Sequence, residues 1–258
     1  MPMSTMSRPI AGYGWIPDLP DHRDYLYAAP PEVLGALPPK MDLRAQCPPV
    51  YDQGALGSCT ANAIGGALQF DQRKQREQDF VPSRLFIYYC EREVENTIDS
   101  DSGAMLRDGI KCVNRDGAPP ETAWPYEIGK FRDKPSQQAY DDAKLHQILA
   151  YQRIPRTLEQ MKGCLATGFP FVFGFRVYES FESQEVAHTG EAPMPASTEQ
   201  ALGGHAVLAV GYDDAAQRFL VRNSWGAGWG AAGYFMLPYA YLINRGLASD
   251  FWSVRSVE

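Results

Sequence analysis

The chain has 258 residues, of which 45% are hydrophobic, and it carries a formal net charge of −7. This length and hydrophobic content allow one large core or two smaller ones. The acidic balance gives no electrostatic footprint for nucleic acid or an anionic membrane surface, and no apolar run approaches the length of a membrane span. We therefore expect a soluble, globular protein with no nucleic-acid or membrane partner.

The first 40 residues hold eight of the twenty prolines, together with Tyr13, Trp15, Tyr25 and Tyr27. Proline removes backbone donors and biases its predecessor toward extended geometry, so this segment cannot form a long helix. We predict an extended N-terminal arm over residues 1–40 that packs its aromatic side chains on the body. Its first residues lack the apolar centre of a secretory signal, so we expect a cytoplasmic protein or one exported without a recognisable signal peptide.

The first candidate for chemistry is Cys59, in the stretch QGALGSCTANA that begins at Gln53. Two glycines mark a tight turn, Ser58 is suited to cap a helix, and apolar residues at helical spacing follow, which predicts a helix from 59 to about 76. Cys59 then lies in the first turn, where free backbone N–H groups and the helix dipole favour the nucleophilic thiolate. Gly65 and Gly66 in this helix suggest that another backbone packs closely there.

Further helices are predicted up to about residue 150. Pro82-Ser83-Arg84 is typical of a helix start, followed by apolar residues and by a charged end at 91–93 that we expect to be solvated. A polar helical stretch is expected at 136–150.

The pattern changes after residue 150. A short capped helix at 157–165 precedes a buried strand at 169–178, a long loop at 179–203, and a hairpin whose strands cover 207–212 and 218–222. His188 in the long loop is expected to be solvated. The two halves, 41–150 and 151–258, therefore differ in secondary structure.

Two stretches in the second half supply partners for the cysteine. His205 lies in GGHAVLAVGY, 146 positions after Cys59, and Asn223 lies in VRNSWG. Together with the stretch around Cys59, they resemble the papain family of cysteine peptidases in order and spacing, and specifically a bacterial-type member. The chain departs from the family at Leu56, where a cysteine is usual, and at Thr60, where an aromatic residue is usual.

The resemblance implies an α+β fold of two subdomains with the active-site cleft between them. A helical lobe, 41–150, would carry Cys59, and a β-barrel-like antiparallel lobe, 151–258, would carry His205 and Asn223. The implied activity is that of a thiol endopeptidase acting on polypeptides through an acyl-thioester. No metal or organic cofactor is implied, and the five cysteines include no C-x-x-C pair.

Roles for individual residues follow from the same resemblance. Cys59 and His205 would rest as a thiolate–imidazolium pair, Asn223 would orient the imidazole, and Trp225 would cover their contact. Gln53 and the backbone N–H of Cys59 would hold the oxyanion.

Ser102, Gly103 and Ala104 resemble the segment that offers its backbone to an extended substrate, and Gly204 is a further candidate for substrate binding. A plain helix entry capped by Ser102 is the alternative for the first three.

Two other functions stay open at this point. A thiol acyltransferase would share the first half-reaction, and a non-catalytic peptide-binding module would share the fold. The arm could also be a short pro-segment that acts as an intramolecular inhibitor. Substrate preference, which depends on the pocket for the side chain two before the cut, is also open. So are the physiological substrate, the oligomeric state and the pairing of the other cysteines at 47, 90, 112 and 164, although free buried thiols are favoured.

Overall fold

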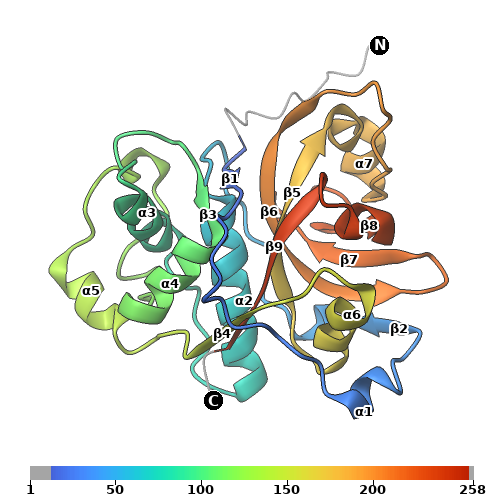
Figure 1. The fold of residues 1–258 in the computed structure, drawn as a ribbon. Coiled ribbons are helices and arrows are strands. Elements are labelled where there is room, and N and C mark those ends of the chain that lie inside the picture. The colour runs from blue at the N-terminus through green and yellow to red at the C-terminus, as the bar shows by residue number, and fades with distance from the viewer. Residues whose placement is uncertain (1–12, 256–258) are drawn as a thin grey trace.

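The structure, a computed structural model, describes residues 13–255, which form two lobes side by side with the N-terminal arm running between them (Figure 1). The first lobe is helical. Its elements are α2 (Cys59–Gln75), α3 (Arg84–Glu95), α4 (Leu106–Asp116), η2 (Ile128–Lys130) and α5 (Gln137–Ala143). The side chain of Ser83 caps α3 by accepting a hydrogen bond from the Phe86 amide, as a serine before an apolar helical run predicts.

The second lobe is built on one antiparallel sheet of seven strands. The strand order is β4-β9-β5-β6-β7-β8, and β2 pairs with β6 beside this path. The strands are β2 (Lys40–Asp42), β4 (Ala150–Arg153), β5 (Phe171–Tyr178), β6 (Ala201–Asp213), β7 (Arg218–Arg222), β8 (Tyr234–Pro238) and β9 (Ala248–Arg255). The first five residues of β5 are all buried, which explains its unbroken apolar sequence. The helices η1 (Arg44–Gln46), α6 (Leu158–Ala166), η3 (Glu179–Glu182), α7 (Gln184–Thr189) and α8 (Tyr239–Ile243) flank this sheet.

The central element is α2, which lies between the other helices of the first lobe and the sheet (Figure 1). All its residues from Cys59 to Gln72 are buried. We expected the glycine pair in the middle of α2 to lie against another backbone. The glycines instead lie against side chains. A Cβ atom at Gly65 would lie 3.4 Å from Arg84 Cγ, and one at Gly66 would lie 3.5 Å from Arg222 Nε.

Three expectations about local structure are wrong. The helix expected over 136–150 is only the short α5, which ends at Ala143, and β4 begins at Ala150. The loop expected over 179–203 contains η3, α7 and the start of β6. The charged end of α3 is not solvated, since Glu91 and Arg92 are both fully buried.

The described part of the arm contains β1 (Trp15–Ile16) and α1 (Pro31–Leu34). The strand β1 pairs in parallel with β3 (Ala104–Met105) of the helical lobe. Trp15 and Tyr27 are buried, whereas Tyr25 is 77% exposed. The predicted packing of arm aromatics on the body therefore holds for Trp15 and Tyr27 but not for Tyr25. Residues 1–12 of the arm lie outside the described residues.

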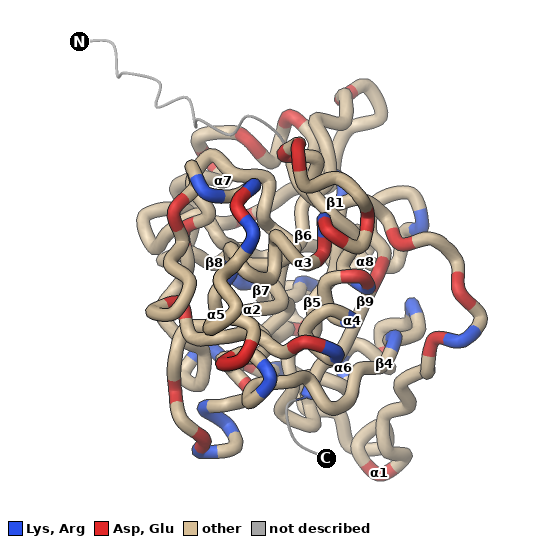
Figure 2. Tube along the Cα trace, turned by 90° about the vertical axis from the view of Figure 1, so that its left-hand side faces the viewer, with Lys and Arg blue, Asp and Glu red and all other residues tan. Residues whose placement is uncertain are grey.

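Lysine and arginine are interspersed with aspartate and glutamate along the trace (Figure 2). Between residues 13 and 255, no helix has the length and apolar character that crossing a membrane requires. All five cysteines are buried free thiols.

Candidate active site

The turn before α2 holds Cys59 at the edge of the helical lobe. Gly54 in this turn has a φ of +60°, and both carboxylate oxygens of Asp101 accept the Gly57 amide at 3.0 Å. Cys59 is the first residue of α2 and is fully buried. The sequence predicts that the Ser58 side chain caps the helix, but it does not. Its hydroxyl contacts the Tyr126 hydroxyl at 2.5 Å.

The strands of the other lobe bring His205 and Asn223 together. His205 lies in β6 and Asn223 follows β7, and the distance from His205 Nε2 to Asn223 Oδ1 is 2.8 Å. Asn223 Oδ1 also accepts the Ser224 amide at 2.9 Å, which fixes the orientation of the side-chain amide. His205 Nε2 must therefore carry the proton, and Nδ1 is left as the basic nitrogen.

Trp225 covers this pair. Its ring stacks on the imidazole with 4.7 Å between centroids and an interplanar angle of 28°. His205, Asn223 and Trp225 are all buried, at 1%, 2% and 6% exposure. The low polarity of such surroundings strengthens the histidine–asparagine hydrogen bond and holds the ring in one orientation.

The sulfur of Cys59 reaches the same strand. The backbone amides of Ala206, Gly14 and Thr60 lie near the sulfur and lower its pKa, and Ala206 directly follows His205. Burial nevertheless raises the pKa of Cys59 to about 12, and the three amides only partly offset this rise. Burial beneath the arm therefore favours the neutral thiol of Cys59 over the thiolate expected from its place in the helix.

Gln53 links the two lobes close to the nucleophile turn. Its Nε2 donates to the Leu56 carbonyl at 2.9 Å, and its Oε1 accepts from the Ser224 hydroxyl at 2.6 Å. The backbone amide of Gln53 donates to the Ser224 carbonyl at 2.9 Å. Since Nε2 carries two hydrogens, one remains available for an oxyanion.

The candidate substrate-binding residues meet the arm. Ala104 donates its amide to the Gly14 carbonyl at 2.7 Å, and a Cβ atom at Gly103 would lie 2.1 Å from that same carbonyl oxygen. Gly204 lies against Trp15, where a Cβ atom would be 2.4 Å from the Trp15 carbonyl oxygen. Ser102 differs, since its hydroxyl bonds to the neighbouring Gly103 carbonyl. It does not cap a helix, because α4 begins at Leu106 after the strand β3.

Comparisons with known proteins agree with this arrangement. The family model described as papain family cysteine protease matches residues 37–250. The chain belongs to the papain family of cysteine proteases.

Individual relatives give the same result. The chain is 45% identical to an uncharacterized peptidase C1-like protein of Acanthamoeba polyphaga mimivirus, over 100% of this chain and 90% of that protein. The crystal structure of xylellain, a cysteine protease from Xylella fastidiosa, has a TM-score of 0.90 and 45% identity, and covers 97% of this chain and 98% of that one. The thiol protease aleurain of Arabidopsis thaliana is 28% identical over 78% of this chain but only 56% of its own length.

Membership of the papain family confirms the expected α+β fold of a helical lobe and an antiparallel β lobe. It also confirms the expected activity class, that of a cysteine-type peptidase. The resemblance to a bacterial member is confirmed by the likeness to xylellain.

Sequence reasoning missed several residues that this papain-family site uses. Asp101 clamps the nucleophile turn and also accepts the hydroxyl of Tyr88. Gly14 lies directly on that turn, since a Cβ atom there would be 1.6 Å from the Gly57 carbonyl oxygen. Asp250 accepts the indole N–H of Trp15. Neither spacing nor composition distinguishes these residues, because each acts through a contact between distant segments.

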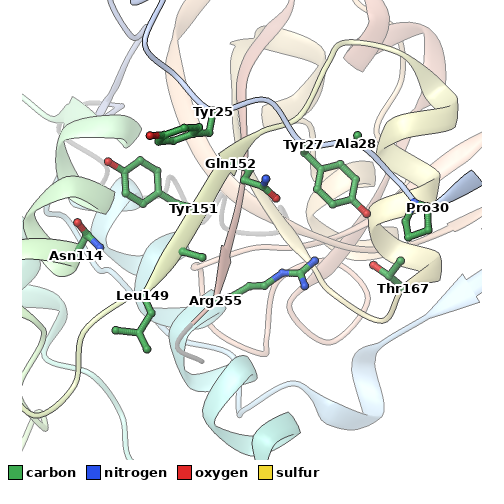
Figure 3. Close-up of a pocket in the computed structure, with 11 residues that line it drawn as sticks. Tyr25, Tyr27, Ala28, Pro30, Asn114, Leu149, Tyr151, Gln152, Thr167 and Arg255 are labelled. Carbon is green, nitrogen blue, oxygen red and sulfur yellow. The ribbon is translucent and has the colours of Figure 1, made fainter. Parts of the chain in front are cut away.

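A cavity of about 750 Å³ lies away from these residues, where the arm crosses β4 (Figure 3). Tyr25 and Tyr27 of the arm and Tyr151 and Gln152 of β4 line it, with Arg255 at its base. None of the candidate catalytic residues lines this cavity.

Proposed function

We propose that this papain-family peptidase is an endopeptidase that cleaves polypeptides with Cys59, His205 and Asn223. The observation that carries the proposal is the buried contact of 2.8 Å between His205 Nε2 and Asn223 Oδ1, next to the Ala206 amide that acts on the Cys59 thiol. Nucleophile, base and orienting group thus come from three separate segments to one place, as a triad requires.

In the proposed reaction, His205 Nδ1 takes the proton of Cys59, and the sulfur attacks the peptide carbonyl carbon. The Cys59 amide and Gln53 Nε2 hold the resulting oxyanion. The C–N bond then breaks, and His205 gives its proton to the leaving amine. Water attacks the thioester while His205 accepts its proton, which releases the new carboxyl group and restores Cys59.

The arm is proposed to inhibit this reaction within the same chain. Gly14 lies on Gly57 with its amide near the Cys59 thiol, and its carbonyl accepts the Ala104 amide that a substrate backbone would use. Tyr13 closes the entrance by an edge contact with His205, at 6.3 Å between ring centroids. A substrate cannot reach Cys59 until these residues leave.

Selective alkylation tests the nucleophile. In full-length protein carrying Trp15→Ala, which loosens the arm, iodoacetamide at mildly acidic pH should label Cys59 in preference to the four other thiols. The reason is that, in the proposed triad, His205 stabilises the thiolate of Cys59 and of no other cysteine. Equal labelling of all accessible thiols would contradict the assignment.

Substitutions then test the partners. His205→Ala should abolish peptide hydrolysis, and Asn223→Ala should lower kcat/KM by about tenfold or more, since the ring loses its orientation. His188→Ala is the matched control, because this histidine is exposed on α7 and should leave the rate unchanged. An unchanged rate in Asn223→Ala would remove the role assigned to that residue.

A thiol acyltransferase remains the second candidate, since it would use the same thioester. Product analysis with and without an added amine separates the two. Hydrolysis products alone support the endopeptidase, whereas amide products formed in the presence of the amine support transfer.

A further inference from the structure

The side chain of Trp15 fills a pocket in the β lobe, one residue along the arm from Gly14, which lies over the sulfur. Trp15 is only 6% exposed. Its pocket is lined by Gly174 of β5 and Gly204 of β6, and Asp250 of β9 lies at its floor. The strand β3, whose Ala104 amide pairs with the arm, lies beside it.

The pocket is large enough for an indole ring because two of the residues that line it are glycines. A Cβ atom at Gly174 would lie 1.9 Å from Trp15 Cε2, and one at Gly204 would lie 2.6 Å from Trp15 Cε3. Both distances are far below van der Waals contact, so any other residue at these positions would occupy the volume that the ring now takes. The pocket is therefore wide enough for a two-ring side chain because both residues lack a Cβ.

The floor of the pocket offers an acceptor. Asp250 Oδ2 accepts the Trp15 indole N–H at 3.2 Å and the Asp18 amide at 2.9 Å, while Oδ1 accepts from Arg153 at 3.2 Å. When the arm leaves, both donors to Oδ2 leave with it. An acceptor of this kind is costly to leave unpaired, so it favours any occupant that brings an N–H or O–H group.

The charged groups that remain near the pocket after the arm departs disfavour a cationic occupant. Asp24 of the arm now pairs with Arg107 at 3.2 Å and with Arg153 at 3.0 Å, and it departs with the arm. Arg153 then neutralises Asp250 through their hydrogen bond, and Arg107 keeps a positive charge that has lost its partner Asp24. A lysine or arginine side chain would meet this charge, whereas a neutral donor would not.

We propose that this pocket selects a tryptophan side chain of the polypeptide substrate, with Asp250 reading the indole N–H. The proposal rests on the proposed endopeptidase function and names the substrate feature that it recognises. A substrate strand paired with Ala104 presents a side chain to the same pocket when the arm is gone. Smaller apolar side chains would leave part of the pocket empty, and phenylalanine would leave Asp250 Oδ2 without a donor.

The test uses full-length protein carrying Trp15→Ala, in which the pocket is empty and the chain is otherwise intact. Its substrates are peptides of one sequence that differ only by a single Trp, Phe, Leu or Arg, with cut sites located by mass spectrometry. When the varied residue is the one that enters the pocket, kcat/KM for the Trp peptide should exceed that for the Phe peptide by about tenfold or more. The two side chains differ by one hydrogen bond to a charged acceptor. Arg should be poorer than Phe.

Two further substitutions, made in the same background, locate the preference. Asp250→Gly removes the acceptor, and glycine readily adopts the backbone φ of +59° at this position. The ratio of kcat/KM for the Trp and Phe peptides should therefore fall to about one. Asp133→Gly, at an exposed carboxylate, is the control and should keep the ratio. Gly174→Ala should cost Trp peptides more than Leu peptides, because its methyl group takes the space of the ring.

A preference for Arg or Leu, or an unchanged ratio in Asp250→Gly, would overturn the pocket assignment while leaving the peptidase intact. The same peptides, used as competitors of Cys59 labelling by iodoacetamide, give the order of binding without turnover. If Cys59 is not labelled selectively and no peptide is cut, the endopeptidase proposal fails, and the pocket proposal fails with it.

Discussion

The two ends of the described arm are held in different ways. Tyr13 to Trp15 lie in the seam over Cys59 and are held by backbone hydrogen bonds and by an indole that fills a pocket. Asp24 lies further along the arm and is held by charged groups, Arg107 and Arg153. Blocking of the site thus depends on shape, and anchoring of the arm depends on charge. The two ends should respond to different perturbations.

The largest effect should come from the shape-dependent end. Trp15→Ala removes a buried indole, a change that costs roughly 3–5 kcal/mol in packed cores. The arm should leave the seam more often, so that the rate of Cys59 alkylation by iodoacetamide in the full-length protein rises about a hundredfold. Tyr25→Ala is the control, because that ring is 77% exposed and should leave the rate unchanged. Equal rates in wild type and Trp15→Ala would show that the indole does not hold the arm.

A smaller effect is expected from the charged end. Asp24→Ala leaves Arg107, whose side chain is 7% exposed, without its partner, so alkylation of Cys59 should accelerate by about tenfold. Asp21→Ala is the matched control, because Asp21 pairs with Arg23, which is 87% exposed, and such pairs contribute little. Added salt should change this difference little, because a buried pair is screened far less than an exposed one. Equal alkylation rates in wild type and Asp24→Ala would contradict electrostatic anchoring.

The smallest expected effect is that of pH, and it concerns Asp18. Burial, and then the nearby Asp250 carboxylate, raise the pKa of Asp18 from 3.8 to about 7 in the docked arm, while bonds from Arg107 and Trp252 oppose the rise. Because docking raises the pKa of this carboxyl group, Asp18 takes up a proton when the arm docks at a pH between the two pKa values. Docking is therefore favoured at low pH and weakens as pH rises from about 4 toward 7.

Hydrogen exchange of the Ala104 amide, corrected for its intrinsic pH dependence, measures this effect. Protection of that amide depends on the Gly14 carbonyl of the arm. It should fall as pH rises from about 5 to about 7, by at most about tenfold per pH unit, the limit that one linked proton sets. Protection that grows with pH would mean that another group controls the arm.

Elements that depend on local sequence signals could be predicted, whereas contacts between distant segments could not. The helix carrying Cys59 was expected over 59 to about 76 and is observed as Cys59–Gln75, because glycines before it and apolar spacing within it are local signals. The strands bearing His205 and next to Asn223 are likewise local patterns. Family resemblance then supplied their roles.

The path of the arm could not be predicted, since Trp15 contacts Ala104 and Asp250 across most of the chain. The burial of the charged end of α3 was also hidden. Glu91 accepts from the Thr60 hydroxyl, and Arg92 lies 4.0 Å from the centroid of the Tyr88 ring. A charged run normally indicates a solvated face, and only the neighbouring helix and loop supply the partners that reverse this rule.

The central claim, that the arm itself blocks a working peptidase, is tested most directly by cutting the arm and adding it back. An added protease that cuts near the exposed Leu19 and Leu26 should release the arm and raise hydrolysis of a Trp-containing peptide. A synthetic peptide of residues 13–28 should then restore inhibition, and the same peptide with Trp15→Ala should not. A rate that stays unchanged after the cut, with the arm shown to have dissociated, would contradict the claim.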